Sequence, residues 1–146
     1  MKLAVIHGPN LDRLGGREPA VYGRVTLDQI NAAIAARAAE LGAEAVIQQQ
    51  DGEGGIVRAI HDAQRDCAAI VINPAAYSHY SLAIADAIRA SAIPVIEVHL
   101  SNIHAREEFR ARTVTGAACR AVICGLGAQS YVLGVEAAVA VANEKG

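Results

Sequence analysis

The run CAAIVIN, residues 67–73, decides the fold of this chain. It is apolar until the asparagine that ends it, and an uninterrupted apolar run of this length is typical of a strand with both faces buried. Such strands occur in parallel sheets that are covered by helices on both sides. We therefore predict a buried strand that ends at Asn73, within an α/β fold.

Strand and helix patterns alternate on both sides of this run. The other predicted strands are residues 3–6 (LAVI), 43–48, 95–100 (VIEVHL) and 119–125 (CRAVICG). Apolar residues at helical spacing predict helices at residues 27–41, 56–66, 82–91 and 128–143, with a short polar helix within 101–112. Regular alternation predicts a flavodoxin-like, doubly wound sheet of five parallel strands in the order 2-1-3-4-5, with helices on both faces.

Composition and charge limit the class of protein. The 146 residues suit a single domain, residues 1–146, and the net charge of −2 gives no broad attraction for nucleic acid or an anionic membrane. We find neither a signal peptide nor an apolar run of about 20 residues. The three cysteines lie in or beside apolar runs, which suits reduced thiols. We expect a cytoplasmic protein that binds neither nucleic acid nor membranes.

The segment from His7 to Gly23, HGPNLDRLGGREPAVYG, is too long for a plain strand-to-helix turn. Such connections usually take about 2–6 residues, and longer ones often fold over a ligand. Two prolines and several bulky apolar residues argue against a freely disordered loop. The segment also follows the carboxyl end of a strand, where open α/β sheets bind ligands. We interpret it as an active-site loop.

Polar residues follow the first, third and fourth predicted strands, whose carboxyl ends open on one edge of a parallel sheet. Glu97 and His99 alternate on one face of their strand, so a carboxylate and an imidazole share a side. Such a pair can set the tautomer of a catalytic histidine. We expect one pocket that is lined by Asn10, Arg17, Tyr22, Asn73, Tyr77, His79, Glu97, His99, Ser101, Asn102, Arg106 and Arg110.

Three long motifs occur in a fixed order. They are GPNLxxLGxREPxxYG from residue 8, NPxAYSHxSxAIxDA from residue 73 and PVIEVHLSNxxAREEFR from residue 94. Together with GLGAQSY at 125–131, they resemble the type II 3-dehydroquinate dehydratase family over essentially the whole chain. The resemblance implies a flavodoxin-like fold and the conversion of 3-dehydroquinate to 3-dehydroshikimate without metal or cofactor, in biosynthetic shikimate or catabolic quinate metabolism.

The resemblance also implies a role for each residue of a catalytic set. The reaction is an anti elimination, which needs a base on one side of the substrate and an acid on the other. Tyr22 matches the tyrosinate base and Arg17 the arginine that stabilises it; an ordinary tyrosine needs about 4 kcal/mol to ionise at neutral pH. His99 matches the acid and Glu97 the carboxylate that orients it. Asn10 matches the residue that orders a water at the enolate oxygen.

The remaining matches bind substrate or join subunits. Backbone amides at Leu100 and Ser101 match the carboxylate site, and Asp86 matches a residue that reaches a neighbour's site in a trimer. The resemblance implies trimers that assemble into dodecamers. Arg106 matches an arginine near the catalytic loop, as a possible support. The residues matching ring-hydroxyl ligands are Asn73, His79 and Arg110.

Each residue also has a structural explanation. Taken alone, Tyr22 would be a packed loop aromatic, Arg17 a solvated charge and His99 a hydrogen-bonded core histidine. Asp86 and Arg89 could form only a helix-face ion pair, and Asn73 could merely end a strand. For the remaining histidines we expect no functional role at His7 and surface positions for His61 and His104.

The chain departs from the family pattern at several positions. Ala75 replaces the usual glycine of NPGAY, and Tyr80 replaces a small hydroxyl residue; both could reshape the pocket. Gln50 and Asp51 stand in a segment that usually reads QSNxEGE, and we expect this change to affect subunit contacts or loop support more than the proton transfers. A diverged, non-catalytic binding or assembly protein is therefore the alternative to a dehydratase.

Other functions of this fold class fit poorly. A flavin carrier needs a Ser/Thr-rich phosphate loop and aromatic walls, but the chain has GPNLD there, no Trp and one Phe. A phosphoacceptor domain needs an aspartate where Asn73 stands. A metal hydrolase needs His, Asp and Glu at ligand spacing, and His99 and His104 do not provide it.

Overall fold

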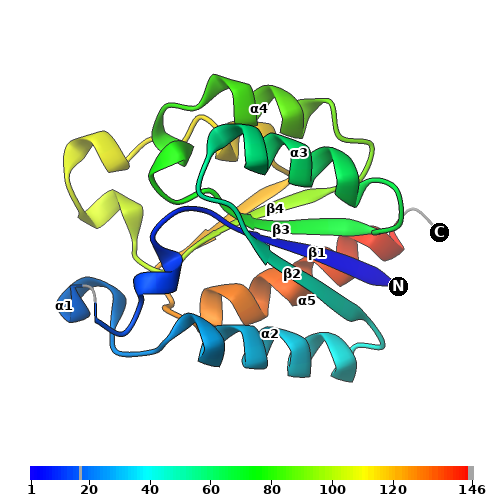
Figure 1. Ribbon diagram of the computed structural model, residues 1–146, viewed down its shortest axis with the longest axis horizontal. Helices are drawn as coiled ribbons and strands as arrows, with labels where there is room; N and C mark the ends of the chain where they lie inside the picture. Colours follow the sequence, from blue (N-terminus) through cyan, green and yellow to red (C-terminus); the bar gives the residue numbers. More distant parts are fainter. Residues whose placement is uncertain (17, 145–146) are drawn as a thin grey trace.

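The predicted strands form one sheet in the computed structural model, which describes residues 1–16 and 18–144 (Figure 1). All neighbouring strands pair in parallel, and their order is β2-β1-β3-β4-β5. This order confirms the predicted flavodoxin-like topology. The strands are β1 Lys2–His7, β2 Glu44–Gln49, β3 Ala69–Asn73, β4 Val95–His99 and β5 Ala121–Cys124.

Helices cover both faces of the sheet, with α2 and α5 on one face and α3 and α4 on the other (Figure 1). The α-helices are α1 Pro19–Tyr22, α2 Leu27–Glu40, α3 Glu53–Ala63, α4 Leu82–Arg89 and α5 Gln129–Asn143. The central strand explains why CAAIVIN is continuously apolar. Val71 faces the core beneath α2 and α5, whereas Ile70 and Ile72 face the core beneath α3 and α4.

Helix α2 starts where the sequence predicts. Thr26 accepts a hydrogen bond from the backbone N–H of Gln29, and the Gln29 side chain accepts one from the N–H of Thr26. This reciprocal pair satisfies two backbone donors that the first turn of a helix leaves open. Ile30 and Ile34 then face the sheet and are fully buried.

Between residues 101 and 112 the predicted short polar helix is divided and of the 3-10 type. The segment forms two 3-10 turns, η3 Ile103–Ala105 and η4 Glu108–Arg110. Ile103 is the one buried residue of these two turns, so there is no apolar stripe whose packing could stabilise a longer helix. Further 3-10 turns are η1 Leu11–Arg13, η2 Ala75–His79 and η5 Gly116–Ala118.

The long loop after β1 is folded onto the body of the protein. Leu11 and Leu14 are buried in the core beneath α2 and α5, and the helical turn α1 carries Tyr22. In Figure 1 the loop lies at the left end of the sheet, beside the connections that follow β3 and β4. The carboxyl ends of the strands thus meet three loops at one edge.

Candidate active site

A hollow of about 480 Å³, counted out to open solvent, lies at this edge of the sheet. The loops after β1, β3 and β4 all line it, so the predicted convergence of the three loops is confirmed. The lining residues are Pro9, Asn10, Leu11, Tyr22, Asn73, Ala75, Ala76, His79, His99, Leu100, Ser101, Ile103, Arg106 and Arg110.

The carboxyl end of β4 holds a buried acid–imidazole pair. His99 Nε2 lies 3.0 Å from Glu97 Oε2, and the two residues are 6 % and 0 % exposed. Because an ionised carboxylate only accepts hydrogen bonds, Nε2 carries the proton of this bond. His99 lines the hollow while Glu97 lies behind it. The pair therefore leaves the second ring nitrogen of His99, Nδ1, to meet a ligand.

Two threonine hydroxyls complete the shell of the Glu97 carboxylate. Thr113 donates to Oε2 at 2.7 Å, and the buried Thr115 donates to Oε1. We did not predict either residue, and the only sequence signal is two hydroxyls spaced two apart ahead of the last strand. Gly116 gives this group its room, since a Cβ there would lie 2.9 Å from Glu97 Oε2 and 2.6 Å from Thr113 Cγ2.

His79 stands next to His99 at the rim of the hollow. The two rings are stacked, with centroids 6.3 Å apart, and His79 Nδ1 lies 2.8 Å from the carbonyl oxygen of Arg112. That carbonyl can only accept, so Nδ1 carries the proton and Nε2 is left as an acceptor. Burial lowers the pKa of His79, which favours the neutral ring.

Tyr22 meets Arg106 on the loop side of the hollow. Arg106 Nη1 donates to the Tyr22 hydroxyl oxygen at 2.8 Å, and its guanidinium carbon lies 5.2 Å from the centre of the Tyr22 ring. The Arg106 side chain is 13 % exposed and also approaches Glu18 and Glu107, both at 3.8 Å. Sequence reasoning gave Arg106 only a supporting place, yet within the described residues it donates a hydrogen bond to the tyrosine oxygen.

The predicted partner of Tyr22, Arg17, lies outside the described residues. Asn10 is exposed at the mouth of the hollow and adopts a left-handed backbone with φ of 70°. Glu18 has φ of 34°. Asparagine tolerates this conformation, whereas it costs other side chains about 1–2 kcal/mol. The loop thus carries conformational strain at Glu18, which directly precedes the helical turn α1 that carries Tyr22.

The predicted binding residues after β3 and β4 line the hollow. Asn73 is 3 % exposed, and its Oδ1 accepts the backbone N–H of Ala75 at 3.0 Å. Leu100 and Ser101 follow β4 directly, so their backbone reaches the same space. Arg110 is held by Glu107, whose carboxylate accepts its Nε–H at 2.8 Å.

Three residues of the predicted site, Tyr77, Asp86 and Asn102, do not line the hollow. Asp86 is on the exposed side of α4, outside the hollow, and forms an ion pair with Arg89 at 3.3 Å. Tyr80 is 62 % exposed and leans on Tyr77, so our expectation that it reshapes the pocket is wrong. Ala75 does line the pocket, with φ of 54°.

No cluster of three or more His, Cys, Asp or Glu side chains that could hold a metal occurs within residues 1–16 and 18–144. The polar groups of the hollow are instead an imidazole pair, a phenol, amides and guanidinium groups. Such groups can exchange protons with a small polar ligand and neutralise negative charge on it. No helix in the described part of the chain is long and apolar enough to span a membrane.

Known proteins share both the sequence and the shape of this chain. It is 49 % identical over 143 residues to a 3-dehydroquinate dehydratase from Pelotomaculum thermopropionicum, covering 98 % of this chain and 99 % of the relative. A second 3-dehydroquinate dehydratase, from Caldanaerobacter subterraneus, is 52 % identical, covering 93 % of this chain and 92 % of the relative.

Solved structures agree. The type II dehydroquinase of Propionibacterium acnes superposes with a TM-score of 0.90 at 44 % identity, covering 95 % of this chain and 96 % of the other. The model of the family described as "Dehydroquinase class II" matches residues 1–139. The match spans the loop with Tyr22, the strand with Glu97 and His99, and the hollow between them. This chain therefore belongs to the class II dehydroquinase family.

Proposed function

We propose that this protein is a 3-dehydroquinate dehydratase, a hydro-lyase that removes water from 3-dehydroquinate by anti elimination through an enolate. One observation carries the proposal: His99, held by the buried Glu97 behind it, lines the same hollow as Tyr22 and Arg106. An anti elimination needs a base and an acid that approach the substrate from different sides, and this arrangement supports both.

Tyr22 is the proposed base, acting as a tyrosinate. It removes a proton from the carbon beside the substrate ketone, and the electron pair of the broken C–H bond forms an enolate. Arg106 donates to the Tyr22 oxygen, and a cationic donor stabilises negative charge on the oxygen that it meets. The family resemblance adds Arg17 to this cation set and assigns to Asn10 a water at the enolate oxygen.

His99 is the proposed acid. In the second step the enolate collapses, the C–O bond on the next carbon breaks, and the departing hydroxyl takes a proton from His99 and leaves as water. Glu97 holds Nε2, so the transferred proton sits on Nδ1. The buried carboxylate also stabilises the imidazolium that carries this proton.

Substrate binding is proposed for the polar groups around this pair. Asn73, His79 and Arg110 bind ring hydroxyls, and the backbone amides of Leu100 and Ser101 bind the substrate carboxylate. Backbone N–H groups suit a carboxylate because hydrogen bonds to a charged acceptor are strong. The family resemblance is the support for these roles, together with the place of each residue on the hollow.

We also propose that residues 1–146 act as a single domain in a trimer, with four trimers forming a dodecamer. Asp86 supports this, since its exposed carboxylate lies outside its own hollow, where a neighbouring subunit can reach it. A cytoplasmic location fits the free thiols of Cys67, Cys119 and Cys124. The proposed pathway is shikimate biosynthesis or quinate catabolism, which use the same reaction.

The test follows the ultraviolet absorbance of the conjugated product when purified protein receives 3-dehydroquinate. We expect the absorbance to rise with the parent protein, and to rise about 100- to 10,000-fold more slowly with Tyr22→Phe. Tyr77→Phe is the matched control, since its hydroxyl donates to the Asp51 carbonyl oxygen and the residue does not line the hollow. A silent parent that still binds the substrate in calorimetry would indicate the alternative, a non-catalytic binding protein.

A further inference from the structure

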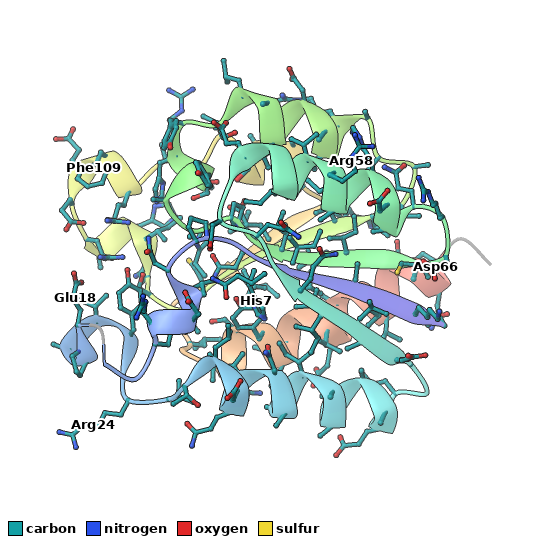
Figure 2. The ribbon with its side chains drawn as sticks, in the orientation of Figure 1. His7, Glu18, Arg24, Arg58, Asp66 and Phe109 are labelled. Atoms are coloured by element: carbon teal, nitrogen blue, oxygen red, sulfur yellow. The ribbon has the colours of Figure 1, made fainter. Side chains whose placement is uncertain are left out.

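A buried histidine lies behind the proposed site and takes no part in the mechanism. His7 ends β1, is 1 % exposed and lies in the interior between the sheet and its covering helices (Figure 2). Its Nδ1 is 2.9 Å from the Tyr131 hydroxyl, and its Nε2 is 2.7 Å from Asn31 Oδ1. Asn73, which lines the hollow, is the register partner of His7 on β3, and a hydrogen bond from its side chain holds the pKa of Tyr131 below the value that burial alone would give.

The direction of each hydrogen bond in this series, from Asn73 through Tyr131 and His7 to Asn31, follows from one backbone group. The N–H of Ala75 can only donate, so the Asn73 atom that it meets at 3.0 Å is the oxygen Oδ1. The Asn73 amide nitrogen therefore donates to the Tyr131 oxygen, and Tyr131 turns its own proton toward His7 Nδ1. His7 then carries its proton on Nε2 and donates it to Asn31 Oδ1.

This arrangement leaves Asn73 with one N–H and one oxygen lone pair for a ligand. A hydroxyl group both donates and accepts, so it can use the two together. With the amide rotated by half a turn, the nitrogen would face the N–H of Ala75 and the oxygen would face Tyr131. The hydrogen-bond series behind the pocket thus decides which atom of Asn73 the ligand meets.

The residues around His7 and Tyr131 keep this hydrogen-bond series rigid and uncharged. Tyr131 is fully buried, and Gly8 lets β1 run so close to β3 that a Cβ there would lie 2.7 Å from the Pro74 carbonyl carbon. His7 faces Asn31 from α2, Tyr131 from α5, and, across the sheet, Gln49 from β2 and Asn73 from β3.

Tyr131 is the one titratable group among these contacts. Burial raises its pKa and lowers the pKa of His7, so both stay neutral. Since a protonated imidazole has no acceptor, this neutrality is what lets His7 take the Tyr131 proton.

We propose that Tyr131 and His7 are positioning residues that fix the Asn73 amide so that it recognises a hydroxyl of the bound substrate. The inference rests on the proposed function for the identity of the substrate. It does not rest on it for the geometry, because the bond directions come from the Ala75 N–H, from the contacts of His7 with Tyr131 and Asn31, and from burial.

The experiment measures kcat and KM for 3-dehydroquinate with Tyr131→Phe, His7→Leu and His7→Asn. Tyr131→Phe removes one hydroxyl without emptying the core, and we expect KM to rise about 3- to 10-fold with kcat within about 2-fold. His7→Leu removes the acceptor and should raise KM similarly. His7→Asn restores an acceptor near the place of Nδ1 and should return KM toward that of the parent. Tyr80→Phe makes the same chemical change on an exposed ring and is the control.

Nitrogen-15 spectra of the parent give a second readout that needs no turnover. We expect His7 as the tautomer protonated on Nε2; protonation on Nδ1 would overturn the inferred direction. An unchanged KM in Tyr131→Phe, or a His7→Asn variant no better than His7→Leu, would overturn the positioning role. If the parent shows no turnover, the proposed function fails, and the calorimetric Kd of the same variants replaces KM in deciding the inference.

Discussion

The two halves of the proposed catalytic site are built differently. The acid half stands on β4, where Glu97 is fully buried and its carboxylate meets His99, Thr113 and Thr115. The base half stands on the long loop after β1, where Tyr22 is partly exposed and meets Arg106 from another loop.

This difference shows how the fold divides the work of an elimination. Groups on a buried strand keep their geometry before any ligand arrives, and such preorganisation is worth most where charge develops during reaction. A loop can move, so it can admit the substrate and then close over it. We therefore expect changes in the acid half to alter kcat and stability together, because the same hydrogen bonds serve both.

The largest effect is expected from Glu97→Gln. All three partners of the carboxylate are donors, so either orientation of the new amide turns an N–H₂ group against one of them. We expect kcat to fall about 100- to 1,000-fold and the free energy of unfolding to fall by about 1–3 kcal/mol. Product absorbance and urea unfolding measure the two quantities.

Glu136→Gln is the matched control for this change. Glu136 lies on α5, far from the hollow, and pairs with Arg37 at 2.9 Å while 37 % of its side chain is exposed. A surface ion pair is worth about 0–1 kcal/mol, so we expect a small loss of stability and an unchanged kcat. If Glu97→Gln and Glu136→Gln changed kcat and the free energy of unfolding equally, the acid half would not be preorganised in the way that we infer.

Thr115→Val tests a single hydroxyl of the acid half. Valine has the shape of threonine, so the core stays filled while Glu97 Oε1 loses its donor. We expect kcat to fall about 3- to 30-fold with KM nearly unchanged, since a hydrogen bond to a charged group contributes about 1.5–3 kcal/mol, of which water can restore a part. Thr115→Ser keeps the hydroxyl and should keep most of the activity; a serine variant as slow as the valine variant would contradict the role of the hydroxyl.

The sequence predicts the frame of the acid half but not its supports. Glu97 and His99 alternate on an apolar strand, so their shared side follows from the two-residue period of a strand. Thr113 and Thr115 come from an irregular segment before β5, and no periodicity indicates that such a segment turns back onto β4. Contacts of this kind depend on the packed tertiary structure.

The base half shows the opposite limit. Its length and polar residues indicate an active-site loop, and residues of this loop line the hollow. The Tyr22–Arg106 hydrogen bond was harder to infer, because it joins residues that are 84 apart in sequence. His7 was expected to have no role for a similar reason, since its bond to Tyr131 joins residues that are 124 apart.

The pH dependence of stability tests the buried chain that starts at His7. Burial lowers the pKa of His7 below its ordinary value of 6.5. Just below that pH, His7 is therefore protonated in the unfolded state but still neutral in the folded state. Stability therefore falls as the pH decreases below about 6.5, until the lowered pKa of the folded protein is reached. His79 has the same sign.

We expect His7→Asn to weaken this acid dependence and His79 to supply the remainder. Urea midpoints of parent and variant, measured above and below pH 6.5 in the same buffer series, give the comparison. If the parent and the variant lose equal stability over this range, the neutral state of His7 is not what acid disrupts.

The smallest expected effect concerns Ala75, where the chain departs from the glycine that is usual in its family. Its φ of 54° costs a side chain about 1–2 kcal/mol, whereas glycine adopts it freely and loses about 0.4–1 kcal/mol more in entropy on folding. We expect Ala75→Gly to stabilise the protein by about 0.5–1 kcal/mol. Ala76→Gly makes the same change at the next residue, within the 3-10 turn η2, and should destabilise the protein by a similar amount. Urea unfolding of the two variants should thus give opposite signs, and a shared sign would mean that the backbone at residue 75 is not strained in solution.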